Sequence, residues 1–527
     1  MLPMLENTDA VGSTLRHISF RRLGTSDVHQ RYLDDDRELC SFLGKRSKNV
    51  AELLRRAPTA AGRAVPRDVM AKAFRAYAER HGAPAKVLAN ADALTDAKTH
   101  VVITGQQPGL IGGPLFNLFK VATAIRLCRD IEKENPGSRC VPVFWNHSDD
   151  HDLEEANRAF LVNSSQEVQR FRLELDRDGA PLRSIRCGRE VQKVLDEIDS
   201  LIPQTEYRQW AMDLFRPRHP DETLGDSMAR MMFSLFGEHG LLIIEPRDMP
   251  TEAFSVLERW WGQANTIRDT VRQSCDQLTD LGVDVTIDPA ATMMFDTTGE
   301  RRQPLADGER YSNATNLSPC ALLRPLWQDA CLPTIGFVVG PGELSYLAVV
   351  APLYRTLGVP QPAFVPRASL TLVEPSMQRI LTKFGWDLPD LEQGPDKLAT
   401  RIQGEEQGGV EEEIDEVAAR LRETLDQIGQ RLAALDASLL SAIDRARTKA
   451  GEELGKLAQK LRTARQNREG TGLRQIRRLC ASLRPRSRLQ ERVLGPLTFL
   501  VAHGQSLGTT LVEASDPFAV EHIVLEL

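Results

Sequence analysis

The residues best suited to chemistry lie in the polar run Asn146–Asp152, which holds two histidines and three aspartates. Carboxylates grouped with histidines can bind a divalent metal, or they can support a general base near neutral pH. Flanking aspartates should stabilise the charged imidazole of His151, so that it holds a proton for transfer or orients a neighbouring group. The same run could instead be a capped helix start at Asp152 with solvated acids. The candidate catalytic residues are Asp149, Asp150, His151 and Asp152.

A second candidate site is the glycine-rich turn Thr104–Gly109, which Gly112-Gly113-Pro114 follows. Glycines between a strand and a helix let backbone amides approach a ligand, and a helix N-terminus favours an anion there. The spacing matches neither the dinucleotide fingerprint nor the P-loop, so a tight structural turn explains the glycines equally well. Two consecutive glutamines and a threonine favour a polar ligand. The candidate binding residues are Thr104, Gly105, Gln106, Gln107, Gly109, Asn117, Lys120 and Asn146.

A third polar turn, Gly340-Pro341-Gly342-Glu343, also separates an apolar run from a helix-like segment. Glu343 stands where a helix N-terminus stabilises an anion, so its simplest role is helix capping. Most arginines and lysines lie at the surface in contact with water, and this is the simplest expectation for Arg324, Arg367 and Lys120. An arginine at a strand end of an α/β sheet can nevertheless clamp a carboxylate or phosphate. The candidates from this half of the chain are Arg324, Gly340, Gly342, Glu343, Tyr346 and Arg367.

Short apolar runs predict the strands that position these turns. Runs at 100–104 and 140–145 flank a helix-like segment at 114–134, which predicts a βαβ unit with a right-handed crossover. Ligands bind beyond the carboxyl ends of such strands, and both strands end in polar sequence. We therefore expect an α/β fold with its active site at that edge. Further strands are predicted at 240–245, 334–339 and 363–365, and helices at 50–56, 67–81, 192–202, 227–236 and 251–281.

The C-terminal third predicts a coiled coil. From Leu425 to Ala446 apolar residues recur in alternating steps of three and four. The segment 405–426 is acidic and 444–492 is basic, so two helices packed antiparallel about a turn near 436–438 are the simplest interpretation. One long helix that pairs with another subunit is the alternative, and we expect a homodimer. The basic stretch lacks interleaved aromatics, so helix pairing is favoured over nucleic-acid binding.

Length and composition limit the class of protein. A chain of 527 residues should form two to four domains, and a net charge of -7 gives no general attraction to nucleic acid or anionic lipid. We find neither an apolar stretch of roughly 20 residues nor a secretory signal, so no membrane span is expected. Eight scattered cysteines without a CxxC pair are typical of reduced thiols in the cytoplasm.

Four parts are expected along the chain. They are a mostly helical N-terminal segment at 1–95, an α/β catalytic core at 96–375, a helical coiled coil at 376–490 and a C-terminal segment at 491–527 that returns to the core. The boundary near residue 95 follows the change from charged helical sequence to alternating strands and helices, and the boundary near residue 375 marks the start of the region that holds the seam.

Five segments resemble the cysteine-adding enzyme of bacillithiol biosynthesis, a cysteine ligase family. They are TGQQPGLIGGPLFNLFK, PVFWNHSDDHDLEEAN, RPLWQDACLPTIGFVVGPGELSYLA, FVPRASLT and SRLQERVL, in the expected order over about residues 100 to 500. The resemblance implies a Rossmann-like core with further α/β connecting segments and a C-terminal coiled coil that forms a dimer. It also implies a ligase that joins the carboxyl of L-cysteine to the free amine of glucosaminyl-malate, giving the low-molecular-weight thiol bacillithiol.

The resemblance places most of the candidates in one substrate pocket. It implies that Thr104, Gln106, Gln107 and Asp149–Asp152 line this pocket, with Arg324, Glu343 and Arg367 as further candidates. The family usually has a glutamate where this chain has Asp149, so this acid is one methylene shorter and its role is open.

The chemistry of the implied reaction adds a nucleotide and three roles. Cysteine needs activation as an acyl-phosphate or acyl-adenylate, and the family can accommodate an adenine nucleotide (ATP or ADP), although this chain has no P-loop. We assign His151 to the proton of the attacking amine, with Asp150 or Asp152 orienting it. Arg324 and Arg367 are assigned to the charge of malate or phosphate.

Two other functions fit part of this sequence. A metal-dependent hydrolase or nucleotidyltransferase could use the Asp/His run, although its spacing matches neither HExxH nor an EF-hand loop and the metal stays unknown. A non-catalytic scaffold could act through the coiled coil. Metal analysis of the purified protein separates the first from a ligase, and thiol profiling of a deletion strain separates the second.

Overall fold

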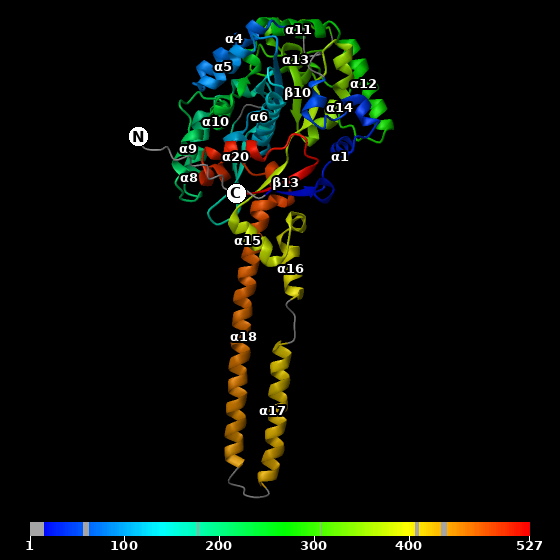
Figure 1. The fold of residues 1–527 in the computed structure, drawn as a ribbon. Coiled ribbons are helices and arrows are strands. Elements are labelled where there is room, and N and C mark those ends of the chain that lie inside the picture. The colour runs from blue at the N-terminus through cyan, green and yellow to red at the C-terminus, as the bar shows by residue number, and fades with distance from the viewer. Residues whose placement is uncertain (1–14, 56–62, 176–178, 307, 406–409, 434–439) are drawn as a thin grey trace, which may run out of the picture. The chain divides into compact units, whose positions relative to one another are not determined.

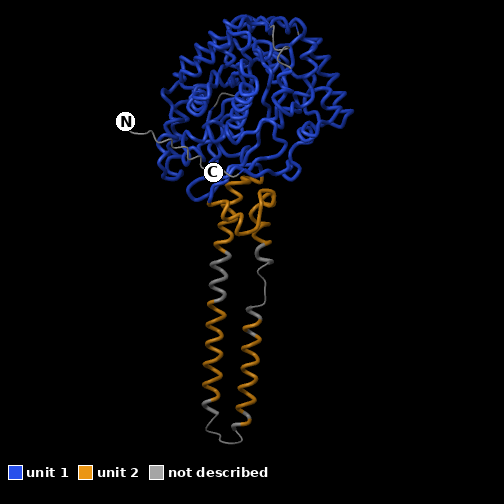
Figure 2. The backbone as a smooth tube through the Cα atoms, in the orientation of Figure 1, with its two compact units in different colours: residues 1–375, 488–527 blue, residues 376–487 orange. Residues whose placement is uncertain are grey.

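The computed structural model describes residues 15–55, 63–175, 179–306, 308–405, 410–433 and 440–527. The chain divides into two compact units (Figure 2). The larger unit comprises residues 1–375 together with 488–527, and the smaller unit comprises residues 376–487. The segment after residue 487 therefore belongs to the same unit as the sheet that carries the candidate site.

The larger unit is built on a five-stranded parallel sheet surrounded by helices (Figure 1). Its strands, in spatial order, are β11 (Ala363–Pro366), β10 (Thr334–Val339), β2 (Thr99–Gln106), β3 (Arg139–Asn146) and β6 (Leu242–Ile244). The chain runs outward from β2 through β3 to β6, and then returns to β10 on the other side of β2. The strand order therefore reverses between β2 and β10, which is where ligands bind in open α/β sheets. The predicted α/β class with a Rossmann-like parallel core is confirmed.

Helix α6 (Phe116–Glu134) makes the predicted crossover between β2 and β3. Helices α8 (Gly188–Asp199) and α10 (Leu224–Phe236) begin earlier than the periodicity predicts; at α10, Thr223 and Asp226 form a capping box that extends the helix. The single helical region predicted at 251–281 is wrong. It is two helices, α11 (Thr251–Trp261) and α12 (Ala264–Asp280), because the backbone leaves helical geometry at Gln263.

The N-terminal segment is mostly helical, as predicted. Its helices are α1 (Asp27–Leu33), α2 (Leu39–Leu43), α3 (Val50–Leu54), α4 (Arg67–Arg80) and α5 (Ala85–Ala93). Sequence reasoning missed strand β1 (Leu15–Ser19), which pairs antiparallel with β13 (Glu521–Glu526); β13 in turn pairs parallel with β12 (Leu370–Val373). Only Ile18 is buried in β1, so the strand carries no clear alternation of apolar and polar residues.

Two small antiparallel sheets lie in the connecting segments. One pairs β4 (Arg158–Val162) with β5 (Val168–Arg172), and the other has β7 (Met294–Asp296) between β8 (Gln303–Pro304) and β9 (Leu317–Pro319). Further α-helices of this unit are α7 (Leu153–Ala156), α9 (Arg208–Phe215), α13 (Arg324–Cys331), α14 (Pro341–Thr356), α19 (Leu497–His503) and α20 (Ser506–Ala514). Among the helices that the structure describes, none combines the length and apolar character needed to cross a membrane.

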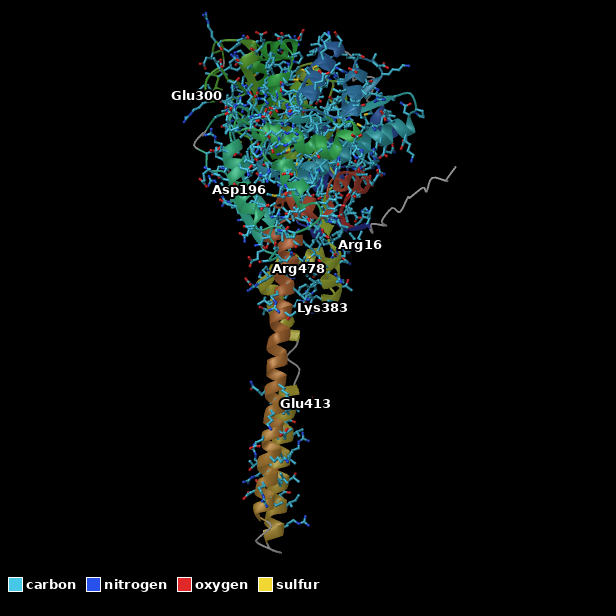
Figure 3. The ribbon with its side chains drawn as sticks, turned by 90° about the vertical axis from the view of Figure 1, so that its left-hand side faces the viewer. Arg16, Asp196, Glu300, Lys383, Glu413 and Arg478 are labelled. Atoms are coloured by element: carbon cyan, nitrogen blue, oxygen red, sulfur yellow. The ribbon has the colours of Figure 1, made fainter. Side chains whose placement is uncertain are left out.

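The smaller unit contains α15 (Pro375–Phe384), α16 (Pro395–Glu405), α17 (Val410–Ala433) and α18 (Leu440–Leu483). The first residue of α15, Pro375, is the last residue of the larger unit before this segment. Within this unit, Lys383 donates to Gln475 and Arg478 donates to Ser376; Lys383 and Arg478 are labelled in Figure 3.

Helices α17 and α18 lie side by side (Figure 1). Asp426 pairs with Arg447 at 3.0 Å, and Gly429 lies against Ile443. Residue numbers rise on one helix as they fall on the other, so the helices are antiparallel and pair within one chain, as the simplest interpretation predicted. The turn predicted at 436–438 lies outside the described residues.

All eight cysteines are buried, and none forms a disulfide in the structure. The Sγ atoms of Cys128 on α6 and Cys140 on β3 lie 3.3 Å apart within a hydrophobic cluster. These two residues therefore pack the crossover helix against the sheet.

One buried carboxyl of the larger unit should make stability depend on pH. Asp329 of α13 accepts a 2.6 Å hydrogen bond from the Tyr354 hydroxyl of α14, and burial raises the pKa of Asp329 to about 7. The folded state therefore binds this proton more tightly than the unfolded state, and the stabilisation is lost as the pH rises from about 4 through 7. We expect Asp329→Asn to remove roughly 3 kcal/mol of pH dependence between pH 4 and 8, measured by urea unfolding at several pH values.

Asp280→Asn, at an exposed residue at the end of α12, is the matched control and should leave the pH dependence unchanged. An Asp329→Asn protein whose stability falls with pH as steeply as that of the unchanged protein would contradict this assignment.

Candidate active site

The polar turns that follow β2 and β10 meet at one buried ammonium group. Lys120 of α6 is 1% exposed. Its Nζ lies 2.7 Å from the carbonyl oxygen of Gly105, 3.1 Å from Oε1 of Gln106 and 2.6 Å from Oε2 of Glu343. The two glycine-rich turns that sequence reasoning treated separately are therefore joined at the point where the strand order reverses. The surface position that is commonest for a lysine does not apply to Lys120.

Glu343 completes this junction from the other side. Its Oε2 accepts a 2.6 Å hydrogen bond from the backbone N–H of Gly340, and its Oε1 accepts one from the Tyr346 hydroxyl at 3.0 Å. Burial lowers the pKa of Lys120, and the negative charge of Glu343 opposes that shift. Burial and the same carboxylate raise the pKa of Tyr346 well above its usual value, so the hydroxyl remains a neutral donor. Glu343 thus caps α14, as predicted, and also neutralises Lys120.

Asp150 is fixed as an anion by an arginine that is distant in the sequence. Nη1 of Arg324, the first residue of α13, donates to Oδ2 of Asp150 at 2.7 Å. Oδ1 of Asp150 accepts from the backbone N–H groups of His151 at 2.8 Å and Asp152 at 3.3 Å. Burial alone would raise the pKa of Asp150, but the charges of Arg324 and Arg302 outweigh burial and hold it well below its usual range. Asp150 therefore organises the turn and does not accept a proton near neutral pH.

The other two aspartates of the run have separate partners. Buried Asp149 forms an ion pair with Arg183 at 2.5 Å. Asp152 accepts from the backbone N–H of Glu155 at 3.1 Å and so caps α7, which is the helix-start interpretation. Neither residue makes a hydrogen bond to the ring of His151.

Arg302 orients His151. Its guanidinium lies 3.9 Å from the ring centroid of Phe295 and donates to the Pro319 carbonyl at 2.6 Å and to Ser318 Oγ at 3.2 Å. Nη1 of Arg302 lies 3.2 Å from Nδ1 of His151. Because an arginine only donates, Nδ1 accepts, and the neutral ring then carries its proton on Nε2.

The expectation that aspartates stabilise a charged His151 is wrong. Burial lowers the pKa of His151, and Arg302 lowers it further; Asp150, 3.9 Å from Nδ1, opposes these effects without overcoming them. His151 is therefore neutral near pH 7, and its side chain is 42% exposed.

A second neutral imidazole, His147, was counted in the same polar run but was not named among the candidate catalytic residues. A Cβ at Gly105 would collide with Nε2 of His147, so glycine is needed at this strand end. Burial, together with the charges of Arg324 and Lys120, lowers the pKa of His147 well below its usual value. Residue type and position could have identified His147, whereas no local motif marks Arg302.

Several predicted binding groups are already engaged within the fold. Arg367 donates two hydrogen bonds to Glu491, at 2.8 and 2.6 Å, and both side chains are buried. The Thr104 hydroxyl donates to the Val338 carbonyl at 2.9 Å. The charge of Arg367 is thus balanced from the C-terminal segment. In the same way Asn117 donates to the Gly112 carbonyl and Asn146 donates to the Gly225 carbonyl.

Several buried polar atoms near the turns have no hydrogen-bond partner among the described residues. They include Nε2 of Gln107, Oδ1 of Asn117 and Oδ1 of Asn146. Gln107 Nε2 is a donor, which fits an anionic oxygen of a ligand. At the start of α14, a Cβ built on Gly342 meets no heavy atom within 4 Å, whereas one on Gly109 would lie 3.0 Å from the Cα of Gly113. Gly342 is therefore the more open approach to the backbone.

The Asp/His run does not form a metal centre in the described part of the chain. No group of three or more histidine, cysteine, aspartate or glutamate side chains there could hold a metal ion. Asp149 and Asp150 instead face arginines, and Asp152 caps a helix. The metal-dependent hydrolase or nucleotidyltransferase therefore has no support in this arrangement.

Two family models match the chain in succession. The model described as Bacillithiol biosynthesis BshC, N-terminal Rossmann-like domain, matches residues 14–368. The model described as Bacillithiol biosynthesis BshC, C-terminal coiled-coil domain, matches residues 370–527. The resemblance drawn from five sequence segments is confirmed by these matches.

Curated relatives agree with the family models. One from Koribacter versatilis (strain Ellin345) is 30% identical over 490 residues, covering 88% of this chain and 90% of that protein. A relative from Salinibacter ruber (strain DSM 13855 / M31) is 28% identical, and the match covers 86% of this chain and 87% of that protein. A relative from Symbiobacterium thermophilum (strain DSM 24528 / JCM 14929 / IAM 14863 / T) is 29% identical, and the match covers 86% of this chain and 89% of that protein. All three are named, provisionally, cysteine ligase BshC.

Loss of the Lys120 charge should destabilise the larger unit. Lys120→Met would leave Glu343 without its cation and the Gly105 carbonyl without its donor, at a cost of about 2–4 kcal/mol. The free energy of unfolding can be measured in urea by the fluorescence of the buried residues Trp145 and Trp327. Glu343→Gln in the same chain should recover part of the loss, because no unpaired carboxylate remains.

Lys72→Met is the matched control, because Lys72 forms an exposed pair with Asp68 at 3.6 Å on α4. Exposed pairs of this kind contribute about 0.5 kcal/mol or less. If Lys120→Met costs no more than Lys72→Met, the Lys120 ion pair does not hold the two turns together.

Proposed function

We propose a specific reaction for this chain, which belongs to the bacillithiol biosynthesis BshC family and is a cysteine ligase. In this reaction the carboxyl of L-cysteine forms an amide with the free amine of glucosaminyl-malate, and the product is bacillithiol. The observation that supports this proposal best is a neutral imidazole at the end of β3, His151, beside arginines whose positions are fixed. An amine must lose a proton to form an amide, and neutral imidazoles are suited to accept it.

His151 manages this proton in the proposed reaction, and His147 is the second imidazole available. Contact with Arg302 leaves the ring proton of His151 on Nε2. Acceptance of a proton from the amine therefore requires Nδ1 to separate from Arg302, or the ring proton to move first. Arg302 thus replaces Asp150 and Asp152 as the residue that orients the ring. Arg324 contributes positive charge near the substrate while it remains bound to Asp150.

In this proposal ATP would activate the cysteine carboxyl as an acyl-phosphate or acyl-adenylate, and the amine would displace phosphate or AMP as the amide bond forms. Gln106 and Gln107 in the turn after β2 and the backbone at Gly340–Gly342 would hold the phosphate groups of ATP. The unpartnered Nε2 of Gln107 and the open N-terminus of α14 support this placement. Lys120 pairs with Glu343, and this ion pair holds the end of β2 close to the start of α14.

We propose that two chains associate through the helical hairpin. Val417, Leu421, Ile428 and Leu457 are between 37% and 51% exposed, although their spacing belongs to an apolar seam. Pairing of α17 with α18 within one chain leaves these side chains uncovered, and a second hairpin would bury them. Figure 3 shows the charged side chains along the hairpin, among them Glu413. We also place the protein in the cytoplasm, where eight unpaired cysteines stay reduced.

Replacement of His151 tests the reaction. His151→Gln keeps an N–H donor near the position of Nε2 but cannot accept a proton, so bacillithiol formation should fall about 100-fold or more. Purified protein would be supplied with L-cysteine, glucosaminyl-malate and ATP, and the product measured by mass spectrometry. His17→Gln, at an exposed position of β1, should retain full activity. Near-normal activity of a folded His151→Gln protein would rule out the proton role, and a wild-type protein that forms no bacillithiol under these conditions would rule out the reaction as proposed.

Charge in the exposed apolar strip tests the homodimer. The double substitution Val417→Lys and Leu457→Lys should convert a dimer to a monomer, as measured by sedimentation equilibrium, because buried lysines would lack partners. Glu423→Lys, at an exposed polar position of α17, introduces the same side chain and should leave the dimer intact. A dimer that survives the double substitution would place the interface elsewhere.

A further inference from the structure

The larger unit contains a cavity of about 460 Å³ whose lining includes none of the candidate active-site residues. Five arginines, two histidines and three acids line it, from α4, α10, the turn after β6 and the loops around residues 186 and 218. A volume of this order suits a small-molecule ligand.

The acids of the cavity neutralise only some of its arginines. Arg80 donates to Asp248 at 2.6 and 2.9 Å, and Arg247 pairs with Asp226 at 3.3 Å. The third acid, Glu222, is engaged by Arg230.

Two guanidinium groups remain without a carboxylate. Among the described residues, Arg186 donates only to the backbone carbonyl of Asp221, at 3.3 Å, and the Arg218 side chain has no hydrogen-bond or ion-pair partner. Arg247 also pairs with Glu245 at 3.3 Å, so the positive charge that no carboxylate balances rests on Arg186 and Arg218.

Two buried atoms in the lining also lack partners. Nη2 of Arg230 and Nε2 of His81 are buried without a hydrogen bond to the described residues. Unsatisfied buried polar atoms are rare, and a donor on arginine can be satisfied only by an acceptor such as an anionic oxygen. The excess charge and the orphaned Arg230 donor therefore call for the same kind of ligand.

We propose that this cavity binds a small polyanion with at least two negative charges on phosphoryl or carboxylate oxygens. Guanidinium groups suit both kinds of oxygen because they donate two parallel hydrogen bonds. Arg186 and Arg218 supply the net charge, and Arg230 supplies a buried donor. The site does not depend on the ligase reaction. It does adjoin the sheet: Oε2 of Glu245 lies 3.3 Å from Nε of Arg247 and accepts a 2.5 Å hydrogen bond from the Ser148 hydroxyl.

Calorimetric titration of the full chain tests this site, with pyrophosphate and citrate as separate probes and no cysteine or glucosaminyl-malate present. We expect the wild-type protein to bind at least one probe with a submillimolar Kd at 0.15 M salt. Arg218→Ala should weaken that binding about tenfold, and Arg186→Ala with Arg218→Ala should weaken it further. Both arginines are exposed, so these substitutions leave the core intact. Tighter binding of pyrophosphate assigns the site to phosphorylated ligands, and tighter binding of citrate assigns it to polycarboxylates.

Arg216→Ala is the matched control. Arg216 lies in the same loop as Arg218, but it pairs with Asp213 at 3.2 Å and does not line the cavity. Binding that Arg216→Ala leaves unchanged and the cavity variants weaken supports the proposal. The proposal is overturned if neither probe binds, if Arg216→Ala weakens binding as much as Arg218→Ala does, or if the double variant binds as tightly as the wild type.

Discussion

The buried ammonium of Lys120 is the constraint on which the candidate site depends. A charge removed from water must find partners inside the protein, and those of Lys120 are Gly105, Gln106 and Glu343. The turn after β2 and the helix start after β10 must therefore lie within hydrogen-bond distance of one atom. This requirement sets the geometry of the point where the strand order reverses. The other candidate residues at the carboxyl ends of the strands lie around this point.

The other charged side chains at the carboxyl ends of the strands are also paired, and the imidazoles among them are neutral. Arg324 holds Asp150, and Arg367 holds Glu491 from the C-terminal segment. Arg302, fixed by Phe295 and two acceptors, donates to His151. Fixed cations depress the pKa values of nearby histidines while they attract anionic substrates. A site of this kind combines positive charge for anionic substrates with imidazoles that are neutral near pH 7.

Sequence reasoning found the elements of the site but not the contacts between them. Apolar runs that end in polar turns predicted the parallel strands, because that pattern is local. The apolar seam of α17 and α18 is also a local pattern and was predicted in the same way. The partners of Lys120 and His151 could not be predicted, because Glu343 and Arg302 lie more than a hundred residues away in the sequence and no periodicity links them. The aspartates beside His151 suggested a charged ring for the same reason: the neighbours in sequence were visible and the arginine was not.

We propose that substrates meet where the strand order reverses between β2 and β10, with the reacting amine beside His151. A crystal structure of the protein with glucosaminyl-malate and ADP bound would test this arrangement. We expect the amine of glucosaminyl-malate within about 4 Å of the His151 ring and the nucleotide phosphates at Gln107 and the start of α14. Glucosaminyl-malate bound away from the carboxyl ends of β2, β3 and β10 would contradict it.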